Sequence, residues 1–112
     1  MWNKPSIKEL EQIPKFYETE EVSSEEKDIH MHFFLGGCDW YVAEYDAERE
    51  LFFGFAILNN DYQMAEWGYV SFKELCDLNV KGIEVDRNLY FEPTKAKNID
   101  KIMKAMNNEV IA

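Results

Sequence analysis

Residues 29–58 read IHMHFFLGGCDWYVAEYDAERELFFGFAIL, and this stretch decides the fold. From 29 to 35, apolar residues recur at every second position, and a period of two is typical of a strand with one face more buried than the other. The pair Gly36-Gly37 then ends the strand, because glycine favours turns over strands. The sequence therefore predicts a first strand that leads into a turn.

Two more strands are expected directly after this turn. Residues 40–45 are mostly apolar and aromatic, residues 46–49 (DAER) are polar, and residues 51–58 are again apolar and rich in Phe. Such an order predicts a hairpin that extends into an antiparallel meander. Because both alternating sides of 51–58 carry bulky apolar residues, both faces of this strand are expected to be covered.

Shorter extended pieces follow on the C-terminal side. Residues 66–70 predict a fourth short strand. Residues 83–85 and 89–91 are expected to be extended and to flank a turn at Asp86-Arg87-Asn88, with Pro93 closing the segment.

Three helices are expected around these strands. Two of them begin at a serine that stands three residues before a glutamate, which is the spacing of a capping box. The third is indicated by apolar residues with helical spacing. The first predicted helix runs from Ser6 to Pro14, with Glu9 in the capping box and Ile7, Leu10 and Ile13 on one face. The second runs from Ser71 to about Leu78, with Glu74 in the capping box. The third runs from about Lys97 to Asn107, and its apolar stripe consists of Ile99, Ile102, Met103 and Met106.

Together these elements predict the α+β class, with an antiparallel β-sheet meander flanked by N-terminal, middle and C-terminal helices. A chain of 112 residues has the size of one domain. We expect a single domain over residues 1–112, with an N-terminal helix and acidic segment in 1–28, the sheet core and one helix in 29–94, and the C-terminal helix in 95–112.

The composition limits the possible functions. The chain carries 12 Lys and Arg against 22 Asp and Glu, a net charge of −10, which disfavours direct binding of nucleic-acid phosphates. Its aromatic content of 15% distinguishes it from a disordered acidic tail. No apolar run is long enough to cross a bilayer and the first residues have no signal-peptide pattern, so we expect a cytoplasmic protein without membrane contact. Cys38 and Cys76 are then expected to be reduced thiols.

The negative charge is concentrated in one region. Residues 18–50 hold 11 acidic and 2 basic residues, a net charge of −9, whereas residues 92–112 hold 3 acidic and 4 basic residues, a net charge of +1. Residues 18–28 contain almost no apolar side chain, so we expect them to form an exposed loop or short helix, called the acidic loop below.

One group of residues has the chemistry of a zinc site. Asp28, His30 and His32 alternate along the first predicted strand and so share one face, with Cys38 just beyond the glycine turn. Imidazole and thiolate are ligands that zinc prefers, but the spacing lacks the paired cysteines of structural zinc sites. Half-exposed strand histidines and a small apolar cysteine fit the same pattern. No cofactor is therefore favoured, and His30, His32 and Cys38 stay as zinc candidates.

A second group combines two carboxylates with an arginine. Glu44 and Glu66 occur in strands that are otherwise apolar or aromatic, and Arg87 lies in the predicted turn. A carboxylate with a displaced pKa beside an arginine acts in some catalytic sites, but structural ion pairs use the same residues. The sequence has no Gly-rich phosphate loop, H-E-x-x-H motif or identifiable nucleophile with a base. We therefore favour a structural ion pair that joins the last strand to the sheet, in a protein that is not an enzyme.

Four blocks of the sequence resemble a known family. They are Trp40 to Asp46 (WYVAEYD), Phe53-Gly54, Glu66 to Leu75 (EWGYVSFKEL) and Asp86 to Pro93 (DRNLYFEP). The family is the small, uncharacterised domain family found on plasmids, conjugative elements and prophages, often near antirestriction genes, with the patterns W-Y-x-T-E, F-G, E-L-G-Y-V-S-x-x-E-L and E-R-D-L-x-F-x-P. The resemblance covers about residues 29–94 and departs from the patterns at Ala43, Trp67, Asp86 and Asn88. It implies a mobile-element setting and a role in evading host defence.

These observations lead to one favoured function. We expect an acidic inhibitor, encoded by a mobile element, that binds a host defence nuclease (anti-CRISPR or antirestriction type) at a basic groove and blocks nucleic-acid access. Its carboxylates would take the positions of DNA phosphates, and their field would speed the encounter. The expected partner-binding residues are Glu18, Glu20, Glu21, Glu25, Glu26, Asp46, Glu48 and Glu50.

Other interpretations stay open. The acidic region fits a surface that only aids solubility, and the chain also fits a structural or regulatory interaction module of plasmid or phage maintenance, or a cryptic hydrolase. Exposed aromatic residues such as Trp2, Tyr17, Tyr62 or Trp67 could anchor the partner in place of the carboxylates. In each case we expect a monomer or weak dimer.

Overall fold

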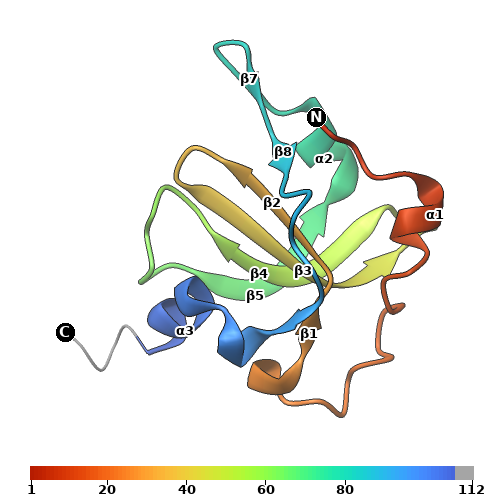
Figure 1. Cartoon of the computed structure of the whole chain (residues 1–112), viewed down its shortest axis with the longest axis vertical. Helices are drawn as coiled ribbons and strands as arrows, with labels where there is room; N and C mark the ends of the chain where they lie inside the picture. The colour runs from red at the N-terminus through yellow and green to blue at the C-terminus, as the bar shows by residue number, and fades with distance from the viewer. Residues whose placement is uncertain (108–112) are drawn as a thin grey trace.

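A five-stranded antiparallel sheet forms the centre of the structure, a computed structural model that describes residues 1–107 (Figure 1). Every neighbouring pair of strands is antiparallel. From one edge to the other, the strands are β5 (Glu66–Ser71), β4 (Leu51–Ile57), β3 (Cys38–Asp46), β2 (Met31–Leu35) and β8 (Asp86–Arg87). The α+β class and the antiparallel meander predicted from the sequence are confirmed.

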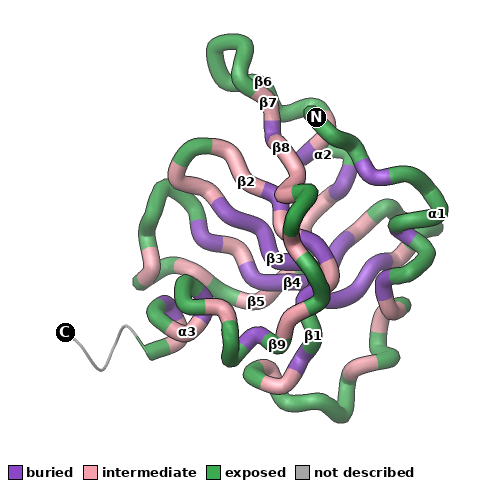
Figure 2. Tube along the Cα trace, viewed as in Figure 1, coloured by how far each residue is buried: buried purple, intermediate pink, exposed green. Residues whose placement is uncertain are grey.

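Two small two-stranded sheets complete the β-structure: β1 (Asp28–Ile29) pairs with β9 (Thr94–Lys95), and β6 (Asn79–Val80) pairs with β7 (Ile83–Glu84). The β6–β7 hairpin projects from the body of the molecule in Figure 1, and Figure 2 shows that most of it is exposed.

The segment after this hairpin differs from the prediction. Asp86 and Arg87, expected in a turn, form the edge strand β8 and pair with Phe34 and Phe33 of β2. Residues 89–91, expected to be extended, instead belong to a turn: the N–H of Phe91 donates to the carbonyl oxygen of Asn88, and the side-chain oxygen of Asn88 accepts the N–H of Tyr90. The turn therefore comes after Arg87 rather than around it, because Asn88 supplies the side chain that bonds the backbone there.

The middle helix has the predicted extent, with Ser71 and Leu78 as its caps, whereas the first and last helices are shorter than predicted. Their bounds are α1 (Ile7–Leu10), α2 (Phe72–Asp77) and α3 (Asp100–Met106), with 3-10 turns η1 (Ser24–Glu26) in the acidic loop and η2 (Ala96–Asn98) before α3. Ser6 makes both hydrogen bonds of the predicted capping box, whereas Ser71 only accepts from the N–H of Glu74. The expected single helix from Lys97 is divided, because Ile99 has an extended backbone between η2 and α3. Ile7 is 77% exposed, so the predicted apolar face of α1 is only partly buried.

The two faces of the sheet carry separate hydrophobic cores, as expected from the Phe-rich strand. The first core includes Phe33, Val42 and Phe52, and residues of α1 and α2 cover it. The second includes Tyr41 and Phe55 from the sheet, and η2 and α3 cover it with Ala96, Ile102 and Ala105. Buried residues accordingly follow β2, β3 and β4 in Figure 2.

A β-bulge in β3 changes which side chains point to each face. The register with β4 shifts between Val42 and Glu44. Regular alternation would put Ala43 and Glu44 on opposite faces. Ala43 belongs to the second core, and Glu44 lies opposite Phe53, which packs against that same core. The bulge thus directs Glu44 to the second face, while the next residue, Tyr45, returns to the first core.

Candidate functional site

A buried carboxylate fixes the backbone at the start of the acidic loop. Glu44 is only 5% exposed. Its two oxygens accept the N–H groups of Tyr17 and Thr19, each at 3.1 Å, and also the hydroxyl of Thr19. Hydrogen bonds to a charged acceptor are stronger than neutral ones, and burial makes their loss more costly. The start of the acidic loop, although almost entirely polar, is therefore attached to β3 through the buried side chain of Glu44.

A buried lysine fixes the other end of the same segment. Lys27 donates from Nζ to the carbonyl oxygen of Thr19 at 2.6 Å and to its hydroxyl at 3.0 Å. The ammonium group also lies 5.9 Å from the ring centroid of Phe53. Thr19 therefore links Glu44 to Lys27, and the residues between 17 and 27 have a defined backbone path, seen in Figure 1 as the orange segment between α1 and β1.

This arrangement leaves most of the expected partner-binding carboxylates facing solvent. Glu18, Glu20, Glu21 and Glu25 of the acidic loop and Glu48 and Glu50 of the β3–β4 turn are exposed, and none of these six forms an ion pair within residues 1–107.

The other two expected residues are neutralised by the protein's own bases. Glu26 pairs with Lys95 at 2.9 Å and with Lys97 at 2.7 Å, and Asp46 pairs with Arg49 at 2.6 Å. The hydrogen bonds from Lys97 and Lys95 lower the pKa of Glu26 to about 2. Within the described part of the chain, Glu26 and Asp46 therefore form ion pairs, unlike the other six expected residues.

A groove of about 710 Å³ lies between the residues that precede the acidic loop and the β3–β4 turn. One wall comes from Phe16 and Tyr17, which precede the acidic loop, and the other comes from Asp46 and Glu48 of the β3–β4 turn. The structure therefore places Tyr17, the residue directly before the acidic loop, beside the β3–β4 turn.

The expected ion pair of Glu44, Glu66 and Arg87 does not form. Arg87 lies on β8 and Glu66 on β5, which are the two opposite edges of the sheet. Arg87 instead pairs with Glu9 of α1 at 2.8 Å, Glu66 is exposed, and Glu44 binds the acidic loop. The arginine does join β8 to the rest of the protein, but its carboxylate partner belongs to the N-terminal helix.

We expect Arg87→Gln to raise the pKa of Glu9 toward its ordinary value of 4.5. The hydrogen bond from Arg87, together with that from the Ser6 backbone, lowers this pKa to about 2. Because the folded-state pKa is depressed, the pair stabilises the fold fully above pH 4.5, and this contribution is lost as the pH falls toward 2. An NMR titration of the Glu9 carboxyl would measure the change, and an unchanged pKa in the variant would contradict the pairing.

The zinc candidates are not placed around one point. Cys38 packs against the first core, whereas His32 stacks on Tyr41 of the second core, with ring centroids 4.5 Å apart. Within residues 1–107, no group of three His, Cys, Asp or Glu side chains is positioned to hold a metal ion. His30 is half-buried, and burial lowers its pKa.

His32 belongs instead to a polar network that the sequence did not reveal. Its Nε2 lies 2.7 Å from Oδ1 of the buried Asp39, whose other oxygen accepts from Lys101 of α3 at 3.0 Å. Its Nδ1 faces the side-chain amide of Asn88 at 3.5 Å. Both ring nitrogens therefore have partners from the protein, and the network links β2, β3, α3 and the turn after β8.

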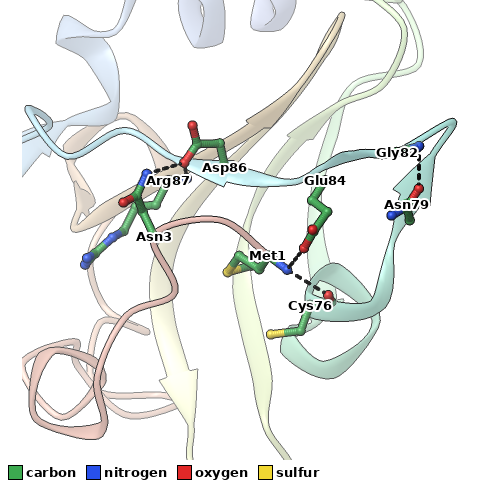
Figure 3. A network of polar contacts seen from close by, with 8 residues as sticks. All are labelled: Met1, Asn3, Cys76, Asn79, Gly82, Glu84, Asp86 and Arg87. Atoms are coloured by element: carbon green, nitrogen blue, oxygen red, sulfur yellow. Dashed lines mark hydrogen bonds and ion pairs between the residues drawn. The ribbon is translucent and has the colours of Figure 1, made fainter.

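A further polar network joins the N-terminal segment to the base of the β6–β7 hairpin (Figure 3). The amino group of Met1 donates to the carbonyl oxygen of Cys76 and pairs with Glu84. Asn3 donates from its side-chain amide to Asp86 at 2.8 Å. These contacts attach residues 1–3 along β7 and β8.

The aromatic anchor candidates differ in accessibility. Trp2 and Tyr17 are exposed, whereas Tyr62 and Trp67 are half-buried and pack against the second core. Tyr69 is 60% exposed and was not identified from the sequence, because its place in a predicted strand gave no sign of its exposure. For Tyr17, which was an anchor candidate, the sequence did not indicate the backbone conformation: its φ of 71° is left-handed, and no sequence pattern predicts this for tyrosine.

Comparison with known proteins identifies a family without assigning an activity. A family model described as "Protein of unknown function (DUF2958)" matches residues 8–109. This match includes all four blocks that predicted an uncharacterised family. Neither the curated proteins nor the solved structures contain a match to this chain. No helix within residues 1–107 is long and apolar enough to cross a membrane.

Proposed function

Because this chain belongs to the DUF2958 family, whose function is unknown, we propose a function from its own surface: it is an acidic inhibitor that binds a basic groove of a host defence nuclease and blocks nucleic-acid access. In this proposal the gene is carried by a mobile element, the inhibitor acts in the cytoplasm of a bacterial host, and the target is a restriction enzyme or a CRISPR effector. The inhibitor acts by binding and needs no cofactor.

The observation that carries this proposal is the attachment of the acidic loop to the sheet. The loop carries four exposed carboxylates, and its backbone forms hydrogen bonds with the buried side chains of Glu44 and Lys27. Carboxylates that imitate phosphates bind best when their positions are set before the encounter, because less conformational entropy is then lost on binding. A loop that served only solubility would not need fixed positions for its carboxylates, whereas a phosphate mimic does.

The distribution of charge supports the same proposal. The basic residues near the C-terminal end are largely paired with the protein's own acids, as in Lys95 and Lys97 with Glu26 and Lys101 with Asp39. The acidic loop and the β3–β4 turn keep their excess negative charge. A local excess of one sign steers an oppositely charged partner and raises the association rate.

We expect binding to depend on the position of the carboxylates and not only on net charge. The test variant changes Glu18, Glu20, Glu21 and Glu25 to Lys, and the control changes Glu66, Glu74, Glu92 and Asp100, which are exposed elsewhere, to Lys. Both variants have the same net charge. Association of the test variant with the target nuclease should be slower by about tenfold or more, and wild-type binding should weaken as salt rises.

A panel of purified restriction and CRISPR nucleases would supply the target, with DNA binding and cleavage measured against increasing inhibitor. The nuclease that is inhibited should lose DNA binding, and association rates should then be compared at two salt concentrations. A complex that leaves DNA binding intact, or an equal loss of affinity in the two variants, would contradict the proposal.

A further inference from the structure

A continuous row of aromatic rings leads from the start of the acidic loop across β5 and β4. Successive ring centroids are 6.1 Å apart for Tyr17 and Phe16, 5.4 Å for Phe16 and Tyr69, 5.5 Å for Tyr69 and Phe53, and 6.0 Å for Phe53 and Trp67. We call these five residues the aromatic strip. Its inner end packs against the second core, and its outer end is open: Tyr17 is 64% exposed.

Tyr17 has a backbone conformation that tyrosine rarely adopts. A positive φ is unusual for a bulky residue and is conformationally unfavourable; the φ of Tyr17 is 71°. The bond from its N–H to the buried Glu44 holds it there. Glycine would adopt this conformation without strain, but it would not place a ring beside the groove. Strained residues of this kind often belong to functional sites.

Carboxylates surround the outer end of the strip. Phe16 and Tyr17 line the groove described above together with three acidic residues, Glu11, Asp46 and Glu48, and two basic residues, Lys15 and Arg49. Glu18 follows directly in the chain and is exposed. Interfaces that bind strongly commonly have aromatic residues at the centre and charged residues at the rim. Here Arg49 pairs with Asp46, and Glu11, Glu48 and the neighbouring Glu18 outnumber Lys15, so the complementary partner is basic.

The protein's own Arg49 shows which basic side chain fits. Its guanidinium carbon lies 5.4 Å from the ring centroid of Phe16, and its Nε donates to Asp46 at 2.6 Å. One planar cation thus contacts an aromatic face and a carboxylate of this groove together. Arginine suits such a site better than lysine, because its guanidinium stacks on rings and presents several donors in a fixed plane.

We infer that this groove receives an arginine side chain of the partner protein, which lies against the exposed end of the aromatic strip and pairs with the carboxylates at the rim. This inference rests on the proposed function and adds the chemistry of the contact. The acidic loop attracts basic surfaces in general, and the aromatic strip selects arginine among them.

The test compares an arginine oligomer with a lysine oligomer of the same length, with binding measured by isothermal titration calorimetry at low salt. Wild-type protein should bind the arginine oligomer more tightly by roughly two- to fivefold, the range expected for exposed cation–π contacts. Tyr17→Gly and Tyr69→Ala should each reduce this preference. The matched control is Tyr90→Ala, because Tyr90 is 94% exposed and outside the aromatic strip, and it should keep the wild-type preference.

The folding of the variants provides a second measurement. Tyr17→Gly should keep or raise the thermal midpoint, since it relieves the positive φ and removes little buried surface. Arg49→Gln should strengthen binding of the arginine oligomer, because it removes the guanidinium that now lies over the Phe16 ring and pairs with Asp46.

The outcomes separate the inference from the proposed function. Equal affinity of the wild type for the two oligomers, or an arginine preference that both tyrosine variants retain, would overturn the inference and leave the acidic inhibitor standing. Failure of both oligomers to bind at low salt would overturn the acidic surface as well. An arginine preference that is lost in both tyrosine variants and kept in Tyr90→Ala would support the inference.

Discussion

Gly54→Ala is expected to lower the free energy of unfolding by about 3 kcal/mol or more, enough to prevent a small domain from folding stably. A methyl group at this position would lie 2.0 Å from the carbonyl oxygen of Tyr41 and 3.0 Å from the Cα of Val42. Both are backbone atoms of β3, so no side-chain rotation relieves the clash. The close approach of β3 and β4 lies beside the β3 bulge, where the register shifts between Val42 and Glu44.

The matched control is Gly68→Ala. Gly68 lies directly opposite Gly54 in the β4–β5 register, and an added methyl group there would meet nothing within 4 Å. We expect stability equal to the wild type or slightly higher, because alanine reduces the entropy of the unfolded chain. Urea denaturation of both variants would measure the difference. Equal stabilities would show that β3 and β4 are farther apart at the bulge than described.

Glu44→Ala is expected to lower the free energy of unfolding by about 3 kcal/mol. The change leaves the N–H groups of Tyr17 and Thr19 without their acceptor and removes the negative group from the cavity that Lys27 also lines. The acidic loop should then lose its fixed path. Amide hydrogen exchange at Thr19 should become faster than at the centre of β3, even where the rest of the protein stays folded.

The same variant also tests the role of the loop in binding. Glu44 is too buried to touch a partner, so weaker inhibition by Glu44→Ala would arise from the loss of loop order. Glu48→Ala is the control: its exposed side chain should change stability by about 0.5 kcal/mol or less. Unchanged exchange at Thr19 in Glu44→Ala would contradict the proposed attachment.

Four of the five strands of the sheet were predictable because each carries its own local signal. Residues 31–35 alternate, Gly36-Gly37 ends the strand, and the Phe-rich strand required cover on both faces, as the two cores confirm. The edge strand at Asp86-Arg87 has no such signal. Two polar residues become a strand only because β2 offers them an unpaired edge, which is a property of the assembled sheet.

The acidic surface was also visible in the sequence, but its internal contacts were not. Which carboxylates stay free depends on pairs between distant segments, such as Glu26 with Lys95. The partner of Arg87 depends on where α1 packs, and the direction of Glu44 depends on a single bulge that reverses the alternation along β3. Sequence spacing carries no information on these three-dimensional relations.

The pairing of β8 with β2 has a consequence for synthesis of the chain on the ribosome. β2 contains the apolar run Phe33-Phe34-Leu35, and its outer edge is covered at Phe33 and Phe34 by residues 86–87. At roughly 5–20 residues per second, the nascent chain exposes this edge for on the order of three to ten seconds before β8 is made. An open apolar edge attracts strands of other chains. The growing polypeptide therefore passes through an interval in which chaperones and translation speed influence its yield, although the finished protein no longer presents that edge at Phe33 and Phe34.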